Sequence, residues 1–136
     1  MTAAVGYSLK IFRTQGTLVI MKNNPLVTLS KEFALDIMLL NDNLRNNGKS
    51  NAIFNQLLRS GTSIGANIHE ANYASSKADF ISKLQIALKE CYETDYWLSL
   101  FFEAKMFSDD VYSNLYSKCC KLRRMLIASL NTAKQN

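Results

Sequence analysis

The sequence predicts an all-α protein, an antiparallel up-and-down bundle of four helices. The chain has 136 residues, and its 48% hydrophobic content is enough to build one core. It holds one proline and five glycines, whereas a sandwich or barrel of many short strands needs many more turn residues. Four segments have apolar residues at alternating steps of three and four and are joined by short connections, which is typical of such a bundle.

The first 24 residues differ from the rest of the chain. They show neither a helical nor a strand period over a useful length, and Gly6, Gly16 and the run Asn23-Asn24-Pro25 interrupt them. We therefore expect residues 1–24 to be a peripheral N-terminal extension and residues 25–136 to form the four-helix bundle domain.

The first helix is expected over residues 29–46. Thr28 or Ser30 can cap its beginning, and Glu32 suits the positive end of the helix dipole. One apolar face follows, made of Phe33, Ile37, Leu40 and Leu44. The run Asn46-Asn47-Gly48 ends the helix, because Gly and Asn accept the left-handed conformation common just past a helix C-terminus.

The second helix is expected from Asn51 to Ala71. Its apolar positions again alternate by three and four residues: Phe54, Leu57, Gly61, Ile64, Ile68 and Ala71. Two glycines inside a helix cost about 1 kcal/mol each relative to alanine. Close approach of a neighbouring helix at Gly61 and Gly65 is the simplest compensation.

A polar seam borders this apolar stripe. Ser63, Asn67 and Glu70 lie at steps of four and three, and Arg59 lies one turn before Ser63. These four residues could be a catalytic constellation, but we favour a structural hydrogen-bond network that fixes helix register. Ser63 can also bond to the carbonyl group four residues earlier.

The third helix is expected from Lys77 to Ala104, because Ser76 and Asp79 resemble a capping box. Apolar residues cover so much of its circumference that it must be buried on more than one side. A single bundle cannot cover all of these faces. We therefore expect a homo-oligomer, with Trp97, Phe101 or Phe102 at a subunit contact.

The fourth helix begins after Ser108, which can cap it, and Asp109 and Asp110 suit its positive end. Its inner stripe comprises Tyr112, Leu115, Cys119, Leu122 and Leu126. Residues 131–136 are expected to fray.

The formal net charge of +5 is concentrated at the two ends of the chain. Residues 1–31 carry four basic and no acidic residues, and residues 111–136 carry five basic and no acidic residues. Residues 32–110 hold seven basic and eleven acidic residues. Lys118, Lys121 and Arg124 share a strip of the fourth helix, which is either an anion-attracting surface for nucleic acid or a solvated helix face.

The sequence offers no convincing catalytic, metal or cofactor site. The three cysteines include an adjacent pair and no CxxC spacing, so reduced thiols of a cytoplasmic protein are expected. His69 is the only histidine, and no second one completes a ligand set with it. There is no phosphate-binding glycine loop and no apolar run long enough for a membrane span. We expect neither an enzyme nor a membrane protein.

Two stretches of the second and third helices resemble a known family. Residues 59–71 read Arg-Ser-x-x-Ser-Ile-x-Ala-Asn-Ile-x-Glu-Ala, and residues 76–90 read Ser-x-x-Asp-Phe-Ile-x-Lys-Leu-x-Ile-Ala-Leu-Lys-Glu. With Glu-Thr-x-Tyr-Trp-Leu at 93–98, they resemble the four-helix-bundle proteins of 23S ribosomal RNA intervening sequences. Ala71 stands where many members have Gly, and His69 where a small residue is common.

The resemblance implies a small up-and-down bundle, a homopentameric ring and no enzymatic activity. It also implies possible association with RNA or DNA, since some members are encoded within ribosomal RNA inserts. Two functions stay open. One is an oligomeric scaffold that binds nucleic acid through the basic surface; the other is a protein–protein assembly module with an unidentified partner and no nucleic-acid role.

Overall fold

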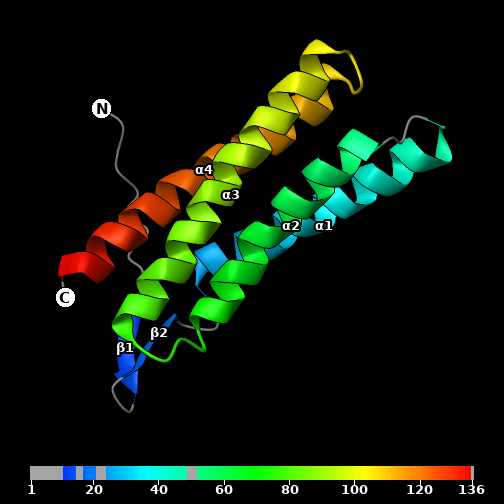
Figure 1. Cartoon of the computed structure of the whole chain (residues 1–136). Coiled ribbons are helices and arrows are strands. Elements are labelled where there is room, and N and C mark those ends of the chain that lie inside the picture. Colours follow the sequence, from blue (N-terminus) through cyan, green and yellow to red (C-terminus); the bar gives the residue numbers. More distant parts are fainter. Residues whose placement is uncertain (1–10, 15–16, 21–23, 49–51, 136) are drawn as a thin grey trace, which may run out of the picture.

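The structure is a computed structural model that describes residues 11–14, 17–20, 24–48 and 52–135. Four helices make up its main body: α1 (Pro25–Asn46), α2 (Ala52–Ala71), α3 (Lys77–Glu103) and α4 (Asp109–Gln135). Consecutive helices pack against one another, and α1 also contacts α4 (Figure 1). The predicted all-α fold of four helices is confirmed.

All four helices contribute fully buried side chains to one core. Phe33, Ile64, Phe80 and Leu122, one from each helix, have no exposed surface. On each helix the buried residues recur at steps of three and four and so form one apolar face, which turns toward the core.

A short β-hairpin precedes the helices. Strands β1 (Ile11–Thr14) and β2 (Thr17–Ile20) are antiparallel, with Ile11 opposite Ile20 and Thr14 opposite Thr17, and β2 contacts α3. The sequence showed no strand period here because each strand has only four residues, too few to establish one. Most of residues 1–23 lie outside the described residues, so their assignment to a peripheral extension stays a prediction.

Helix α1 begins four residues earlier than expected. Asn24 caps it by accepting a hydrogen bond from the Leu26 backbone N–H at 2.8 Å, and Pro25 occupies the first helical position. Proline is favoured there because its fixed φ fits the helix and its missing N–H would have no partner. The expected caps at Thr28 and Ser30 were therefore wrong, and Ser30 is instead buried inside the helix.

Helix α1 approaches α2 closely at the two glycines. A β-carbon on Gly61 would lie 3.0 Å from the Ile37 side chain, and one on Gly65 would lie 3.3 Å from the Ser30 carbonyl oxygen. The close approach predicted from the sequence is confirmed. The neighbour of Gly65 is the backbone of Ser30, which cannot move aside as easily as the Ile37 side chain next to Gly61.

The ends of α3 and α4 follow their capping residues. Ser76 Oγ accepts a hydrogen bond from the Asp79 N–H at 3.1 Å, and Ser108 Oγ accepts one from the Val111 N–H at 3.3 Å. The expected fraying from residue 131 was wrong, because α4 continues to Gln135. Ala133 in that last turn is fully buried, so packing holds it in the helix.

Candidate functional site

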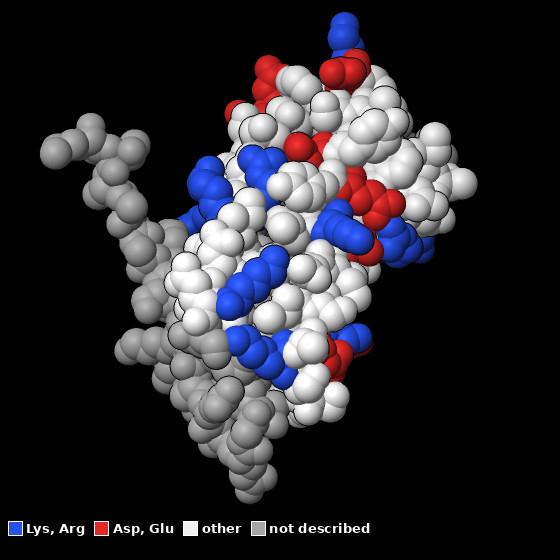
Figure 2. Space-filling model, turned by 60° about the vertical axis from the view of Figure 1, so that its left-hand side comes forward, with Lys and Arg blue, Asp and Glu red and all other residues white. Residues whose placement is uncertain are grey.

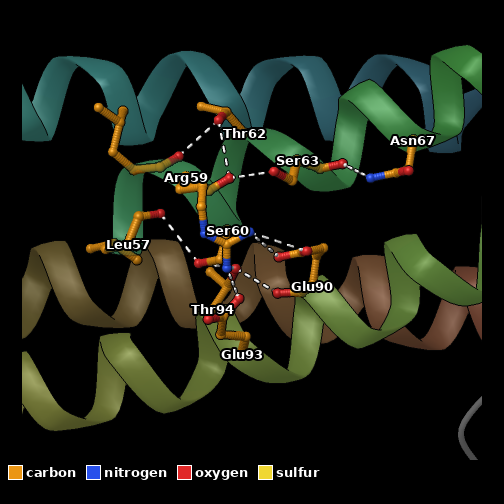
Figure 3. Close-up of polar contacts among 10 residues, drawn as sticks. Leu57, Arg59, Ser60, Thr62, Ser63, Asn67, Glu90, Glu93 and Thr94 are labelled. Atoms are coloured by element: carbon orange, nitrogen blue, oxygen red, sulfur yellow. Dashed lines mark hydrogen bonds and ion pairs between the residues drawn. The ribbon is translucent and has the colours of Figure 1, made fainter. Parts of the chain in front are cut away.

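The polar seam lies where α2 passes along α3 (Figure 3). The Arg59 guanidinium on α2 reaches two carboxylates of α3, with Nη1 at 3.3 Å from Glu90 Oε1 and Nη2 in contact with Glu93. Arg59 is half exposed, while Glu90 keeps only 17% of its side-chain surface. One guanidinium thus ties together two acidic residues one turn apart on α3.

The two carboxylates have different electrostatic environments. Burial is the largest influence on Glu90 and raises its pKa, against the opposing charge of Arg59. Burial also acts to raise the pKa of Glu93, but hydrogen bonds from Arg59 and Glu90 outweigh it and lower that pKa. Of the two carboxyl groups that bind Arg59, Glu93 is therefore the more acidic.

A second contact between α2 and α3 lies deeper in the core. The hydroxyl oxygens of Thr94 and Ser60 are 3.0 Å apart, and neither residue has exposed surface. Thr94 Oγ1 also lies 2.7 Å from the Glu90 carbonyl oxygen, to which it donates. The sequence did not lead us to predict this pair, although Thr94 and Ser60 each stand within the apolar stripe of their helix.

The remaining seam residues make mostly local contacts. Ser63 donates to the Arg59 carbonyl oxygen at 2.6 Å, and Asn67 donates to the Ser63 carbonyl oxygen at 2.8 Å. Both bonds lie within α2. Glu70 instead accepts a hydrogen bond from Lys83 on α3 at 2.9 Å. Only the ends of the predicted seam, Arg59 and Glu70, therefore reach α3 through these bonds.

Two hollows of the described part of the chain lie away from the polar seam. A cavity of about 10 Å³ lies between α1 and α2, and a groove of about 240 Å³ lies between α1 and α4; neither is lined by seam residues. Among residues 11–14, 17–20, 24–48 and 52–135, no group of three or more His, Cys, Asp and Glu could hold a metal ion.

The buried thiols are poor candidates for nucleophilic chemistry. The neighbouring Cys119 thiol and burial raise the pKa of Cys91 well above its ordinary value. Cys119 is buried as well, with its sulfur 3.5 Å from the Cys91 carbonyl oxygen. A thiolate is therefore disfavoured at Cys91.

The three residues of the predicted basic strip on α4, Lys118, Lys121 and Arg124, have different surroundings. Lys118 turns toward α1, where its ammonium binds Asp36 and lies 2.9 Å from Glu32. Arg124 is exposed and Lys121 is half-buried. Figure 2 shows one face on which Lys and Arg side chains are spread over a largely uncharged surface, without one dense patch.

The three aromatic residues expected at a subunit contact have different exposure. Phe101 retains 5% of its surface and packs on Phe54 with ring centroids 4.7 Å apart, so it belongs to the core of a single chain. Trp97 is half-buried. Phe102 is also half-buried and stacks on Tyr112 at 4.1 Å. Phe101 therefore has almost no surface left to bury in an oligomer.

Comparison with known proteins places the chain in a family. Residues 22–128 match the 23S rRNA-intervening sequence protein family. The chain belongs to this family. No curated protein matches it.

A crystal structure from Bacteroides thetaiotaomicron, described as a protein of unknown function from the S23 ribosomal protein family, is similar to this 23S rRNA-intervening sequence family member. It shares 43% sequence identity and a TM-score of 0.75, over 77% of this chain and 97% of that one. The family match includes the polar seam, Lys118, Lys121 and Arg124. In the part of the chain that the structure describes, no helix is long and apolar enough to cross a membrane.

Proposed function

We propose that this member of the 23S rRNA-intervening sequence protein family is a non-enzymatic scaffold that assembles into a homo-oligomer. The main support for this proposal is the exposure of large apolar side chains on the outside of the bundle. Leu39 is 67% exposed, Tyr96 60%, Leu35 52% and Tyr92 51%. These residues form two groups, Leu35 and Leu39 on α1 and Tyr92 and Tyr96 on α3. Clusters of exposed apolar side chains mark protein–protein contacts in soluble proteins.

Further features of the scaffold are part of the same proposal. Short connections and packing between consecutive helices support an antiparallel up-and-down order. Five copies per ring are proposed from the family resemblance. Three free cysteines, two of them buried, support a cytoplasmic location, where thiols stay reduced.

A non-enzymatic role fits the polar seam. Its side chains bind charged groups of α3 or the backbone of α2, as described for Arg59, Glu70, Ser63 and Asn67. The ion pairs of Arg59 and Glu70 join α2 to α3, which supports a structural role, and the raised pKa of Cys91 disfavours a nucleophilic thiol.

Light scattering coupled to size-exclusion chromatography tests the scaffold proposal directly. At micromolar concentration the protein should elute as one species several times heavier than the 15.4 kDa chain, and five copies are expected. A stable monomer at these concentrations would contradict the proposal.

Nucleic-acid binding is the second candidate function. It is supported by the five basic residues and no acidic residue of the segment 111–136, and by the exposure of Arg124. The contacts of Lys118 with Glu32 and Asp36 weaken it, because part of the positive charge of the proposed Lys118, Lys121 and Arg124 strip is already neutralised. We therefore rank assembly first.

A further inference from the structure

One exposed apolar surface lies on the outer side of α1. Leu35, Met38 and Leu39 are 52%, 50% and 67% exposed, and their spacing places them together on one face of the helix. We call these three residues the aliphatic face. Leu39 also lines the groove between α1 and α4, so the apolar surface continues into a concave region.

A second exposed surface follows the line where α3 meets α4. Tyr92 is 51% exposed, and the Arg123 guanidinium lies over its ring at 5.9 Å from the centroid. Tyr116 and Ile127 on α4 are each 38% exposed. We call Tyr92, Tyr116, Arg123 and Ile127 the aromatic seam. Tyrosine and arginine are enriched at the energetically dominant centres of protein interfaces.

The aromatic seam is held in place by contacts within the chain. Tyr116 stacks on Tyr112 at 5.4 Å, and Tyr112 stacks on Phe102 at 4.1 Å. Arg123 lies 3.9 Å from Asp95 as well as over Tyr92. Side chains fixed in this way lose little conformational freedom when a partner binds.

The two surfaces can be occupied at the same time. The helices α1 and α3 each pack against both α2 and α4, so α1 and α3 lie diagonally across the bundle. The aliphatic face is on α1, while the aromatic seam joins α3 to the neighbouring α4. Two surfaces at separate places suit a head-to-tail contact, in which one surface of each copy binds the other surface of the next.

We propose that the aliphatic face of one copy packs on the aromatic seam of a second copy of this chain. The inference rests on the proposed function, since it assigns the surfaces through which the scaffold assembles. Repetition of the same contact gives a ring when the rotation between successive copies closes and an open filament when it does not, whereas a contact of either surface with itself would stop at a dimer.

Charge supports a second copy as the occupant. The exposed Asp42 lies one turn beyond Met38 and Leu39, and the exposed Arg124 lies one turn before Ile127. Neither has an ion pair within the described residues. Lys31 and Arg45 lie further out, at the two ends of the aliphatic face. The proposed packing brings the carboxylate of Asp42 toward the basic side of α4.

The test uses one variant for each surface and then mixes them. Leu39→Lys damages the aliphatic face and Ile127→Lys damages the aromatic seam, while each variant keeps the other surface intact. Both positions are exposed, so both variants should keep the helical circular dichroism of the wild type. Tyr73→Lys is the matched control, because Tyr73 is 77% exposed and belongs to neither surface.

Light scattering should find each surface variant monomeric and the Tyr73→Lys control assembled like the wild type. An equimolar mixture of Leu39→Lys and Ile127→Lys should form a 1:1 complex of twice the 15.4 kDa chain mass. Only one intact contact is possible in that mixture, so the complex cannot grow further.

The outcomes separate this inference from the proposed function. A monomeric wild type would overturn the scaffold itself. An assembled wild type with either surface variant still fully assembled, or two monomeric variants that fail to combine, would overturn the assignment of these surfaces and leave the scaffold standing.

Discussion

The Thr94 hydroxyl on α3 and the Ser60 hydroxyl on α2 lie 3.0 Å apart with no exposure to solvent. They occupy positions of the apolar stripes at which a hydrophobic residue would normally stand. Thr94 also bonds to the Glu90 carbonyl oxygen at 2.7 Å, whereas the other contact of Ser60, with the Leu57 carbonyl oxygen, is 3.4 Å long. Ser60 therefore depends on Thr94 for its shorter hydrogen bond, and loss of a buried partner costs about 1–3 kcal/mol. The pair therefore favours one register between the two helices.

Thr94→Val should lower the free energy of unfolding by about 1–3 kcal/mol, because it preserves the side-chain shape but leaves Ser60 without its partner on α3. Urea denaturation at a fixed protein concentration measures the change. The double variant Ser60→Ala, Thr94→Val should lose less than the sum of the two single losses, since the groups act together.

Thr62→Val is the control for this pair. The Thr62 hydroxyl bonds to the Leu58 carbonyl oxygen of its own helix at 2.8 Å and is only partly buried. Its replacement should change stability by less than about 0.5 kcal/mol. Strictly additive losses at Ser60 and Thr94 would argue against a coupled pair.

The contact between Gly65 and Ser30 gives the second prediction. Because a β-carbon there would lie 3.3 Å from a backbone oxygen, Gly65→Leu should force α1 and α2 apart and cost about 1–3 kcal/mol or more. Ala66→Leu, at the next and exposed position, should be close to neutral. Thermal unfolding of both variants measures the difference, and equal melting temperatures would show that the close approach is unimportant.

The third prediction concerns Lys118 and pH. Its hydrogen bond to Asp36, with a further contribution from Glu32, raises the pKa of Lys118 above the ordinary 10.5 despite partial burial. A raised pKa means that the ammonium stabilises the folded chain fully below the unfolded pKa. That stabilisation is lost as pH rises through the higher folded pKa.

Lys118→Met should therefore cost about 1 kcal/mol at pH 7, and the difference from the wild type should stay constant to about pH 9. Above about pH 10.5 the difference should shrink, because the wild-type ammonium loses its proton as well. Lys89→Met is the control, since Lys89 is exposed and takes part in none of the ion pairs between described residues. A difference that grew with pH in this range would refute the role of the ammonium.

Much of the fold could be predicted because apolar spacing and capping chemistry are local. Ser76 and Ser108 were predicted as helix caps, and both accept the expected backbone hydrogen bond. The two glycines likewise indicated the close approach of α1 to α2. The Asn24 cap was also a local signal, since asparagine precedes a proline there, but Thr28 and Ser30 competed with it as good capping residues nearer the apolar face.

The missed contacts depend on which helices become neighbours. Lys118 and Asp36 are 82 residues apart, and helical spacing alone does not tell which helix lies beside a given face of α4. Phe101 looked available for a subunit contact because α3 is apolar on several sides. The packing of Phe54 against it shows that α2 already covers that side within one chain.

The last prediction separates nucleic-acid binding from assembly. Each Lys or Arg that contacts a phosphate displaces a counterion, so the logarithm of affinity falls with the logarithm of salt concentration in proportion to the number of contacts. Because Lys118 already binds two carboxylates, Lys118→Gln should leave affinity and salt slope nearly unchanged. If nucleic acid is bound, Arg124→Gln should reduce both, since Arg124 is exposed.

The measurement is the binding of mixed-sequence single- and double-stranded nucleic acid at several salt concentrations, after light scattering has shown that both variants assemble like the wild type. Because the ion pairs of Lys118 leave fewer basic groups for phosphate, binding should be weak and should disappear near physiological salt. Binding that persists there, with a slope reduced by Arg124→Gln, would place nucleic-acid binding ahead of assembly alone.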